Sequence, residues 1–424
     1  MQKQTEFKGG VEILCIGTEL LLGDILNSNA QWLAKQLALL GLPHYQQSVV
    51  GDNEFRLKEK ILESKERCHV LITTGGIGPT PDDLTTATIA SAFNTPLEEN
   101  EEAWIDIQQK ISSKSKKSAL SNRKQALFPV GAKLIPNPSG TAPGMIWQPS
   151  DGFTILTFPG VPSELKLMWN QTAIQWFKTQ GMTKNIFLSR VLKVSGIPES
   201  TLAEDISELL KKTNPTVATY AKLGEVELRL TAKASTIGKA KELISPIEKQ
   251  LRDNLGPQCY GSDNESLASV LIALLRKRKE SLSIAESCTG GGLGAAITAI
   301  PGASDIFKGG IISYSNSIKQ EILRVPETLI KQYGAVSREV VQAMAIGVRE
   351  KLKSDWAIAI SGVAGPEGGT NASPVGCVHI AIAGPQGCES KLIHFGSYRE
   401  RKAIQQLSVL SGLDQLRLIL QAQS

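Results

Sequence analysis

Two regions of the chain alternate short β-branched strands with helical stretches, and this alternation limits the possible folds most. In residues 1–180 the predicted strands include VEILCIG, HVLITT and FTILTF, with helices expected between them. Residues 264–424 repeat the pattern, from a strand at SLSIA to a final helix that begins near Arg399. Such alternation is typical of βαβ units in a parallel sheet. The sequence therefore predicts an α/β protein with two α/β sandwich domains, one in each region.

The segment between these regions has a different order of elements. Residues 185–256 run as strand, helix, two strands and helix, which predicts a small α+β domain with both helices on one face of its sheet. The stretch GPQCYGSDNES at 256–266 is polar and rich in turn-forming residues, so we expect a linker there. The predicted organisation is three domains, at 1–180, 185–256 and 264–424.

The composition narrows the possible functions. The chain has 424 residues, of which 41% are apolar, enough for the cores of two to four domains. Its six cysteines and four histidines show neither C-x-x-C nor H-x-x-x-H spacing, so no disulfide framework or zinc site is expected. We also expect no signal peptide or membrane span, hence a cytoplasmic protein. The thinly spread net charge of +5 suits small anionic substrates and argues against a nucleic-acid surface.

A glycine-rich loop, TTGGIGPTPDDLT at 73–85, follows the predicted strand HVLITT. Ligands of open α/β sheets bind at the carboxyl ends of strands, and glycines let backbone N–H groups approach a phosphate. Asp82 and Asp83 would suit a divalent metal beside that phosphate. They could equally cap the next helix or favour its dipole, and the residues alone leave both interpretations open.

A second glycine-rich stretch, AESCTGGGLGAAITAIPG at 285–302, joins a predicted strand to a helix of small residues. The Ser287 hydroxyl would lie where free N–H groups stabilise an oxyanion, but serine is a weak nucleophile without a base. His379 and His394 are on predicted strands, where packed or edge histidines are the better interpretation. Lys319, expected at the start of a helix, becomes a base if desolvation lowers its pKa, and a solvated surface lysine is the alternative.

Three segments of the first region resemble a known fold. GTELLLG (17–23), TTGGIGPTPDDLT (73–85) and FPGVPSE (158–164) resemble, in order and spacing, the molybdopterin-binding fold of the competence/damage-inducible protein A (CinA) family. In that family this domain is linked to metal-dependent cleavage of ADP-ribose into AMP and ribose 5-phosphate. The resemblance implies that Asp82 and Asp83 hold the metal, Mg²⁺ or Co²⁺. The substrate contacts that it implies are Thr18, Glu19, Thr74, Gly75, Gly76 and Gly78.

The last region resembles the carboxy-terminal domain of the same family, whose stand-alone relatives are nicotinamide mononucleotide (NMN) deamidases. The resemblance rests on AESCTGG, PGASDIFKGGIISYSNSIKQEIL, GAVS, and SGVAGPEGGT followed by PVG. It implies Ser287 as nucleophile, Lys319 as its partner and Tyr314 as a residue that assists proton transfer or orients the pair. No cofactor is expected for this domain. The substrate contacts that the resemblance implies are Glu286, Thr289, Gly290, Asn316, Ser361, Gly362, Gly365, Thr370 and Arg399.

Two positions depart from the family pattern. Ser373 stands where the family often has Lys before Pro-Val-Gly, and Ser397-Tyr398 precede Arg399 where the family has Gly-Asp. Because the arginine is kept, Arg399 can still pair with a phosphate. The departures therefore bear on affinity more than on the type of reaction.

The middle region resembles the family's KH-like domain in position and element order. It lacks the G-x-x-G loop with which KH modules clamp nucleic acid, and its acidic and basic residues are nearly balanced. A spacer or dimerisation element is expected instead, within a homodimer. The whole chain is interpreted as a nucleotide hydrolase acting on NMN and ADP-ribose. The alternatives are a non-enzymatic accessory protein in competence or DNA damage, and a molybdopterin-binding protein.

Overall fold

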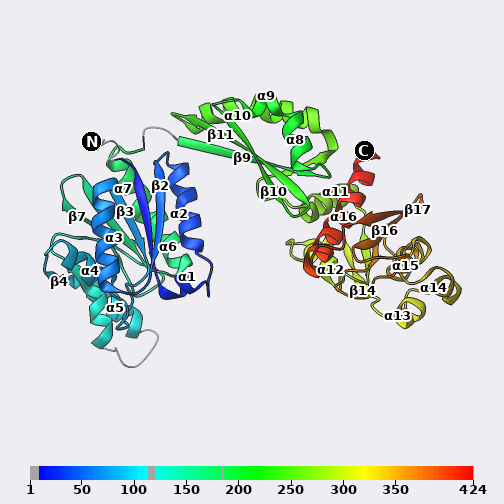
Figure 1. The fold of residues 1–424 in the computed structure, drawn as a ribbon, viewed down its shortest axis with the longest axis horizontal. Helices are drawn as coiled ribbons and strands as arrows, with labels where there is room; N and C mark the ends of the chain where they lie inside the picture. The colour runs from blue at the N-terminus through cyan, green and yellow to red at the C-terminus, as the bar shows by residue number, and fades with distance from the viewer. Residues whose placement is uncertain (1–8, 113–119, 184–185, 424) are drawn as a thin grey trace. The chain divides into compact units, whose positions relative to one another are not determined.

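The computed structural model describes residues 9–112, 120–183 and 186–423 (Figure 1). Its residues group into two units. The first contains Met1–Leu188 and Lys233–Lys241, and the second contains Ser189–Ala232 and Glu242–Ser424. Within the described residues, none of the helices combines the length and the apolarity that a bilayer crossing requires.

The first unit is built on a six-stranded sheet with the order β2-β1-β3-β8-β7-β6. The strands are β1 (Val11–Ile16), β2 (His44–Val50), β3 (Val70–Thr74), β6 (Lys133–Ile135), β7 (Gly144–Ser150) and β8 (Phe153–Phe158). Pairing is parallel from β2 to β8 and antiparallel for β7 and β6. A separate pair joins β4 (Leu97–Glu99) to β5 (Leu127–Pro129).

Helices cover both faces of this sheet. On one face lie α2 (Ser28–Leu39), α6 (Pro162–Met168) and α7 (Ile174–Thr179), and on the other lie α3 (Glu54–Arg67), α4 (Thr85–Ala92) and α5 (Glu101–Ser112) (Figure 1). Side chains alternate along each strand, so Ile13 packs with the first group of helices and Leu14 with the second. The short α1 (Thr18–Leu22) follows β1 and buries none of its residues. The predicted α/β sandwich is confirmed.

The middle region forms a four-stranded sheet with the order β10-β11-β9-β12. Its elements are β9 (Ile186–Ser195), α8 (Glu199–Asp205), α9 (Ser207–Leu210), β10 (Thr216–Lys222), β11 (Glu225–Ala234), α10 (Ile237–Leu255) and β12 (Cys259–Ser262). The predicted linker at 256–266 is wrong, because β12 lies inside it and pairs antiparallel with β9. The Cys259 and Tyr260 side chains are buried, which explains why this polar stretch does not leave the domain.

The last region contains a five-stranded sheet with the order β14-β13-β15-β16-β17. The strands are β13 (Leu282–Glu286), β14 (Phe307–Ile312), β15 (Trp356–Gly362), β16 (Cys377–Gly384) and β17 (Gly387–His394). Strands β14, β13 and β15 are parallel to one another, whereas β16 pairs antiparallel with both β15 and β17. The domain is therefore α/β as predicted, with a mixed sheet.

The two faces of this sheet carry side chains of different size. Ile358 and Ile360 of β15 pack with α11 (Leu267–Arg278), α12 (Gly292–Thr298) and α16 (Arg401–Ala422). The intervening residues of β15, Ala357 and Ala359, pack against α15 (Arg338–Leu352). Small side chains let a helix approach a sheet closely, whereas large ones fill the wider layer. The shorter α13 (Asn316–Glu321) and α14 (Glu327–Tyr333) complete the domain.

Candidate active sites

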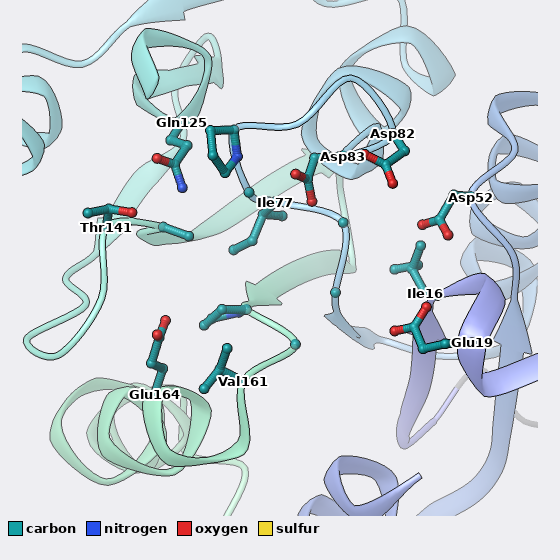
Figure 2. A pocket seen from close by; sticks show the side chains of 18 residues that line it. Ile16, Glu19, Asp52, Ile77, Asp82, Asp83, Gln125, Thr141, Val161 and Glu164 are labelled. Atoms are coloured by element: carbon teal, nitrogen blue, oxygen red, sulfur yellow. The ribbon is translucent and has the colours of Figure 1, made fainter. Parts of the chain in front are cut away.

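The first candidate site lies where three parallel strands end. The register pairs Cys15 of β1 with Thr74 of β3, and Thr74 with Phe158 of β8, so the loops after these strands begin at one edge of the sheet. They surround a pocket of about 460 Å³ (Figure 2). The three segments that the sequence singled out thus meet, as ligand sites in open α/β sheets do. The pocket is lined by Ile16, Gly17, Glu19, Asp52, Gly75–Pro79, Asp82, Asp83, Gln125, Thr141, Ala142, Pro159–Val161 and Glu164.

Two glycines of the central loop have no room for a side chain. Gly75 has φ of 103°, and a Cβ there would lie 2.1 Å from the carbonyl oxygen of Ile16. A Cβ at Gly78 would lie 2.6 Å from Oδ2 of Asp83. Glycine therefore lets the backbone pass close to a neighbouring strand and to a carboxylate, and leaves the loop backbone accessible to a ligand.

Five carboxylates line this pocket: Glu19, Asp52, Asp82, Asp83 and Glu164. Figure 2 shows the first four on one side of the pocket and Glu164 on the other, below Gln125 and Thr141. Oxygen ligands of this kind suit a hard divalent cation.

The interpretation of Asp82 as the N-cap of the next helix is wrong. The following helix, α4, begins at Thr85, and its N-cap residue is Leu84, which makes no side-chain cap. The Asp83 carboxylate instead accepts hydrogen bonds from the backbone N–H of Thr80 at 2.8 Å and from the Thr80 hydroxyl at 2.5 Å. These bonds close a turn ahead of the helix, so the two aspartates face the pocket from a loop.

A metal would need ligands beyond the protein. Among the residues that the structure describes, no three His, Cys, Asp or Glu side chains are grouped closely enough to hold an ion. Mg²⁺ is commonly held by one or two carboxylates together with phosphate oxygens of the substrate. Asp82 and Asp83 fit that arrangement by their chemistry and by their position in the pocket.

Two predicted substrate contacts have other hydrogen-bond partners. The Thr18 hydroxyl donates to Asp52 at 2.8 Å, and the Thr74 hydroxyl donates to the Pro159 carbonyl at 2.9 Å. Neither threonine is among the residues that line the pocket. Their hydroxyls hold the loops in place, and their direct contacts with substrate stay predictions.

The sequence analysis missed Asp52, Gln125, Thr141 and Glu164, which also line the pocket. Asp52 could have been found, because VVGD places it two residues after the end of another parallel strand. Gln125 carries no such signal, and its buried Oε1 atom has no hydrogen-bond partner among the residues that the structure describes.

The second candidate site also lies at the ends of neighbouring parallel strands. Glu286, the last residue of β13, pairs with Ile312, the last residue of β14. Ser287 therefore follows one strand beside the segment that follows the other. The predicted helix of small residues begins at Gly292, so Ser287 lies in a turn before α12.

Lys319 reaches this turn from α13. The Ser315 side chain caps that helix by accepting from the Ile318 N–H, and the first turns of the helix bring Lys319 back toward the strand ends. Its Nζ atom lies 3.4 Å from Oγ of Ser287 and donates to the Ser313 carbonyl at 2.8 Å. The side chain is 1% exposed, and this burial lowers the pKa of the ammonium below its ordinary value. Lys319 is therefore a buried amine, and the surface-lysine alternative is wrong.

Cys288, next to Ser287, is in a different environment. Its side chain is 5% exposed and belongs to the apolar core, and burial raises the pKa of the thiol to about 11. A thiol that keeps its proton is a poor nucleophile. Neither His379 nor His394 has a hydrogen bond to Ser287 within the described parts of the chain.

Two residues expected to contact substrate belong to the framework instead. The Glu286 carboxylate accepts from the N–H groups of Gly291, Leu293 and Gly294 at 2.9–3.0 Å, so both oxygens hold the start of α12. The buried Ser361 hydroxyl donates to the Ala335 carbonyl at 2.8 Å. These bonds give both side chains a structural role, and their contacts with substrate stay predictions.

Thr289, in the same turn, has a side chain whose hydrogen-bonding capacity is unused. Its hydroxyl is buried and has no hydrogen-bond partner among the described residues. An unpaired buried hydroxyl is costly unless a ligand or water completes it. This supports the prediction that Thr289 contacts substrate.

Arg401 was missed, although it lies two residues beyond the predicted Arg399. Arg401 donates to the Gly365 carbonyl at 2.6 Å and to the Tyr314 hydroxyl at 3.2 Å. Arg399 instead donates to the Phe395 carbonyl at 2.9 Å and stacks on the Tyr398 ring. The motif YRERK holds both arginines, and only the fold separates them.

The remaining predicted contacts lie around this turn and in the loop after β15. Gly290 follows Thr289 with φ of 59°, and Asn316 is the first residue of α13. Gly362 ends β15, and the Thr370 hydroxyl accepts from the Ser373 N–H at 3.0 Å. Their contacts with substrate stay predictions.

Comparison with known proteins follows the same three segments. A probable molybdopterin binding domain matches residues 12–179, a damage-inducible protein CinA KH domain matches 189–261, and a CinA C-terminal domain matches 264–420. A CinA-like protein of Prochlorococcus marinus (strain MIT 9313) is 62% identical over 411 residues, which cover 97% of this chain and 96% of that protein. The chain belongs to the CinA family.

Two further relatives match different shares of the chain. A CinA-like protein of Parasynechococcus marenigrum (strain WH8102) is 57% identical over 417 residues, covering 98% of this chain and all of that protein. The crystal structure of competence/damage inducible protein CihA from Agrobacterium tumefaciens is 33% identical, covers 37% of this chain and 93% of its own, and has a TM-score of 0.35. The family and the order of its three domains, expected from the motifs, are confirmed.

Proposed function

We propose that the C-terminal domain of this CinA-family chain is an amidohydrolase that deamidates NMN to nicotinate mononucleotide. The observation that carries this proposal is the buried Lys319 amine, 3.4 Å from the Ser287 hydroxyl. Desolvation favours the neutral amine, which can accept a proton, and the pair then has the logic of a Ser-Lys hydrolase.

The reaction proceeds in two steps. Neutral Lys319 takes the proton of Ser287, whose oxygen attacks the carboxamide carbon of NMN, and the proton is passed to the departing ammonia. Water then attacks the resulting acyl-enzyme, releases the nicotinate carboxylate and returns the proton to Ser287. The balance is NMN plus water to nicotinate mononucleotide plus ammonia.

Three neighbouring side chains, Thr289, Tyr314 and Arg401, assist the reaction by binding the substrate. The unpaired Thr289 hydroxyl is available to donate to the carbonyl oxygen or to the nucleotide. Tyr314, 63% exposed, presents its hydroxyl beside Arg401, and that guanidinium is available for a substrate phosphate. These residues bind and orient the substrate, while Ser287 and Lys319 carry the proton and the acyl group.

We propose a second activity for the N-terminal domain, hydrolysis of ADP-ribose to AMP and ribose 5-phosphate. What supports it is a pocket of about 460 Å³ with a glycine-rich backbone on one wall and five carboxylates around it. Asp82 and Asp83 would hold a divalent cation, which neutralises charge on the diphosphate when bound. The loop glycines would let backbone N–H groups face the phosphates.

The nucleophile is tested by two neighbouring substitutions in the purified chain supplied with NMN. Ser287→Ala is expected to reduce ammonia release by about 10³-fold or more, since it removes the attacking atom. Cys288→Ala is the matched control and should keep most of the activity. The reverse pattern would reject the serine assignment.

Two other functions would give different results. A molybdopterin-binding protein or a non-enzymatic accessory protein would release neither ammonia from NMN nor AMP from ADP-ribose. Absence of both products at high enzyme concentration, with the chain folded, would favour these alternatives over the hydrolase.

A further inference from the structure

The first two turns of α16 contact the segments that follow three neighbouring strands of the C-terminal sheet, β14, β13 and β15. Arg401 donates to the Gly365 carbonyl after β15 and to the Tyr314 hydroxyl after β14. Gln405, one helical turn further on, donates from Nε2 to the Cys288 carbonyl after β13 at 2.8 Å. Residues four apart lie on the same face of a helix, so one face of α16 holds the three segments together.

The bond from Gln405 reaches the turn that carries the proposed nucleophile. The carbonyl groups of Ser287 and Thr289 accept from the N–H groups at positions 290 and 292, inside the same turn. The Cys288 carbonyl lies between them in sequence and accepts instead from Gln405, which is 117 residues away. The orientation of the peptide group after Cys288 therefore depends on a contact from outside the turn.

This peptide group also carries the N–H of Thr289. The peptide is trans, so its carbonyl and its N–H point in opposite directions. No residue in the described parts of the chain accepts from the Thr289 N–H, whereas the N–H groups at positions 290–294 all have acceptors. In serine hydrolases a backbone N–H close after the nucleophile commonly stabilises the oxyanion. By fixing the carbonyl, Gln405 fixes the direction of this unpaired donor.

We propose that Gln405 is a positioning residue of the deamidase site. Its hydrogen bond to the Cys288 carbonyl holds the turn of Ser287 and directs the Thr289 N–H toward the oxygen that becomes negative when Ser287 attacks. This inference rests on the proposed amidohydrolase function. Gln405 acts through the peptide group, so the proton transfer between Ser287 and Lys319 does not involve it.

The kinetics of Gln405→Met test the proposal, because methionine keeps the length of the side chain and removes the donor. We expect kcat for NMN to fall about tenfold and KM to stay within about twofold of the parent, since the oxyanion forms only in the transition state. The pH dependence of kcat/KM should keep its midpoint, because Lys319 is untouched. Gln406→Met, at the exposed neighbouring position, is the matched control and should behave as the parent. Parental kinetics in Gln405→Met, or a raised KM with unchanged kcat, would overturn the positioning role.

A second pair of variants separates the hydrogen bond from packing. Gln405→Lys keeps a donor on a side chain of similar length and should recover most of the parental kcat. Gln405→Glu keeps the shape but cannot donate when ionised, so it should lose about tenfold in kcat and replaces Gln405→Met if that variant has a lowered melting temperature. Equal losses in Gln405→Lys and Gln405→Glu, with both chains folded, would reject the hydrogen bond as the cause.

Labelling of Ser287 by a fluorophosphonate separates this inference from the choice of substrate. The Ser287 oxygen displaces fluoride from phosphorus, its proton passes to Lys319, and the phosphonyl oxygen takes the place of the oxyanion. Followed by mass spectrometry, labelling of Gln405→Met should be about tenfold slower than that of the parent. Slower labelling in a chain that leaves NMN intact would reject the substrate and keep the role of Gln405. Equal rates would reject that role, and an unlabelled parent would reject the nucleophile and the inference together.

Discussion

The two candidate sites lie at equivalent places in two α/β sheets but differ in the chemistry that they can support. The N-terminal pocket is lined by five carboxylates and a glycine-rich backbone. The C-terminal site contains a buried amine beside a hydroxyl, and the carboxylate of Glu286, which precedes Ser287, is engaged by three backbone N–H groups. We propose that the first site uses an added cation, whereas the second uses Lys319 as its base.

In both domains the topology of the sheet determines where the candidate site lies, and the loop residues determine which reaction the site can support. In both domains the strand register brings consecutive loops to one edge of the sheet. The loops of the N-terminal domain carry acidic side chains that line a pocket. In the C-terminal domain, a short helix brings a lysine back into the interior.

The largest expected effect follows from removing the base. Lys319→Met keeps the length and apolar packing of the side chain but cannot accept a proton. We expect NMN deamidation to fall by about 10³-fold or more, nearly as far as in Ser287→Ala, since groups that act as one unit give non-additive losses. Ammonia release by the two single variants and the double variant measures this.

The melting temperature serves as the control for this pair. The substitution removes a desolvated amine, whose burial is itself costly. The Lys319→Met chain should therefore lose at most the stability that the hydrogen bond from Lys319 to the Ser313 carbonyl contributes. A double variant much slower than either single variant would show that Ser287 and Lys319 act independently.

A somewhat smaller effect is expected from the acidic site. Changing both Asp82 and Asp83 to Asn removes two charges while nearly preserving shape, and should lower AMP release from ADP-ribose by about 10²-fold or more at fixed metal concentration. NMN deamidation by the same sample should be unchanged, which provides an internal control. Parental cleavage with the same metal dependence would move the ligands elsewhere in the pocket, for example to Glu19 or Asp52.

The pH dependence of deamidation should show the lowered pKa of Lys319. Only the neutral amine can accept the Ser287 proton, so the rate should rise about tenfold per pH unit below that pKa and level off above it. Because burial lowers the pKa, the plateau should begin below the ordinary lysine value of 10.5. A value of kcat/KM that continues to rise up to pH 10.5 would contradict the interpretation of Lys319 as a desolvated base.

The smallest expected effect separates the two arginines. Arg401→Gln should raise KM for NMN by about tenfold, since a charged partner of the phosphate is lost, whereas Arg399→Gln should change KM only a few-fold. The distinction follows from Arg401 contacting Tyr314 and Gly365 while Arg399 bonds to Phe395. A larger effect at Arg399 would restore the assignment made from the sequence motif.

Sequence patterns predicted most of the fold because buried parallel strands leave long apolar runs. The exception, β12, is short and lies among turn-forming residues, and its strand character depends on pairing with β9. The motifs predicted that Ser287 and Lys319 lie together, but the burial of Lys319 depends on how α13 folds back. Arg401 escaped because its partner Tyr314 is 87 residues away in sequence, where local patterns give no information. Asp52 was overlooked although it closely follows the end of β2.

We propose that one chain holds a metal-dependent and a metal-independent hydrolase. The most direct test supplies one purified sample with NMN and with ADP-ribose, each with and without a chelator, and identifies the products. We expect nicotinate mononucleotide and ammonia from NMN whether or not the chelator is present, and AMP from ADP-ribose only without it. Deamidation that stops with the chelator, or ADP-ribose cleavage that survives it, would contradict the account.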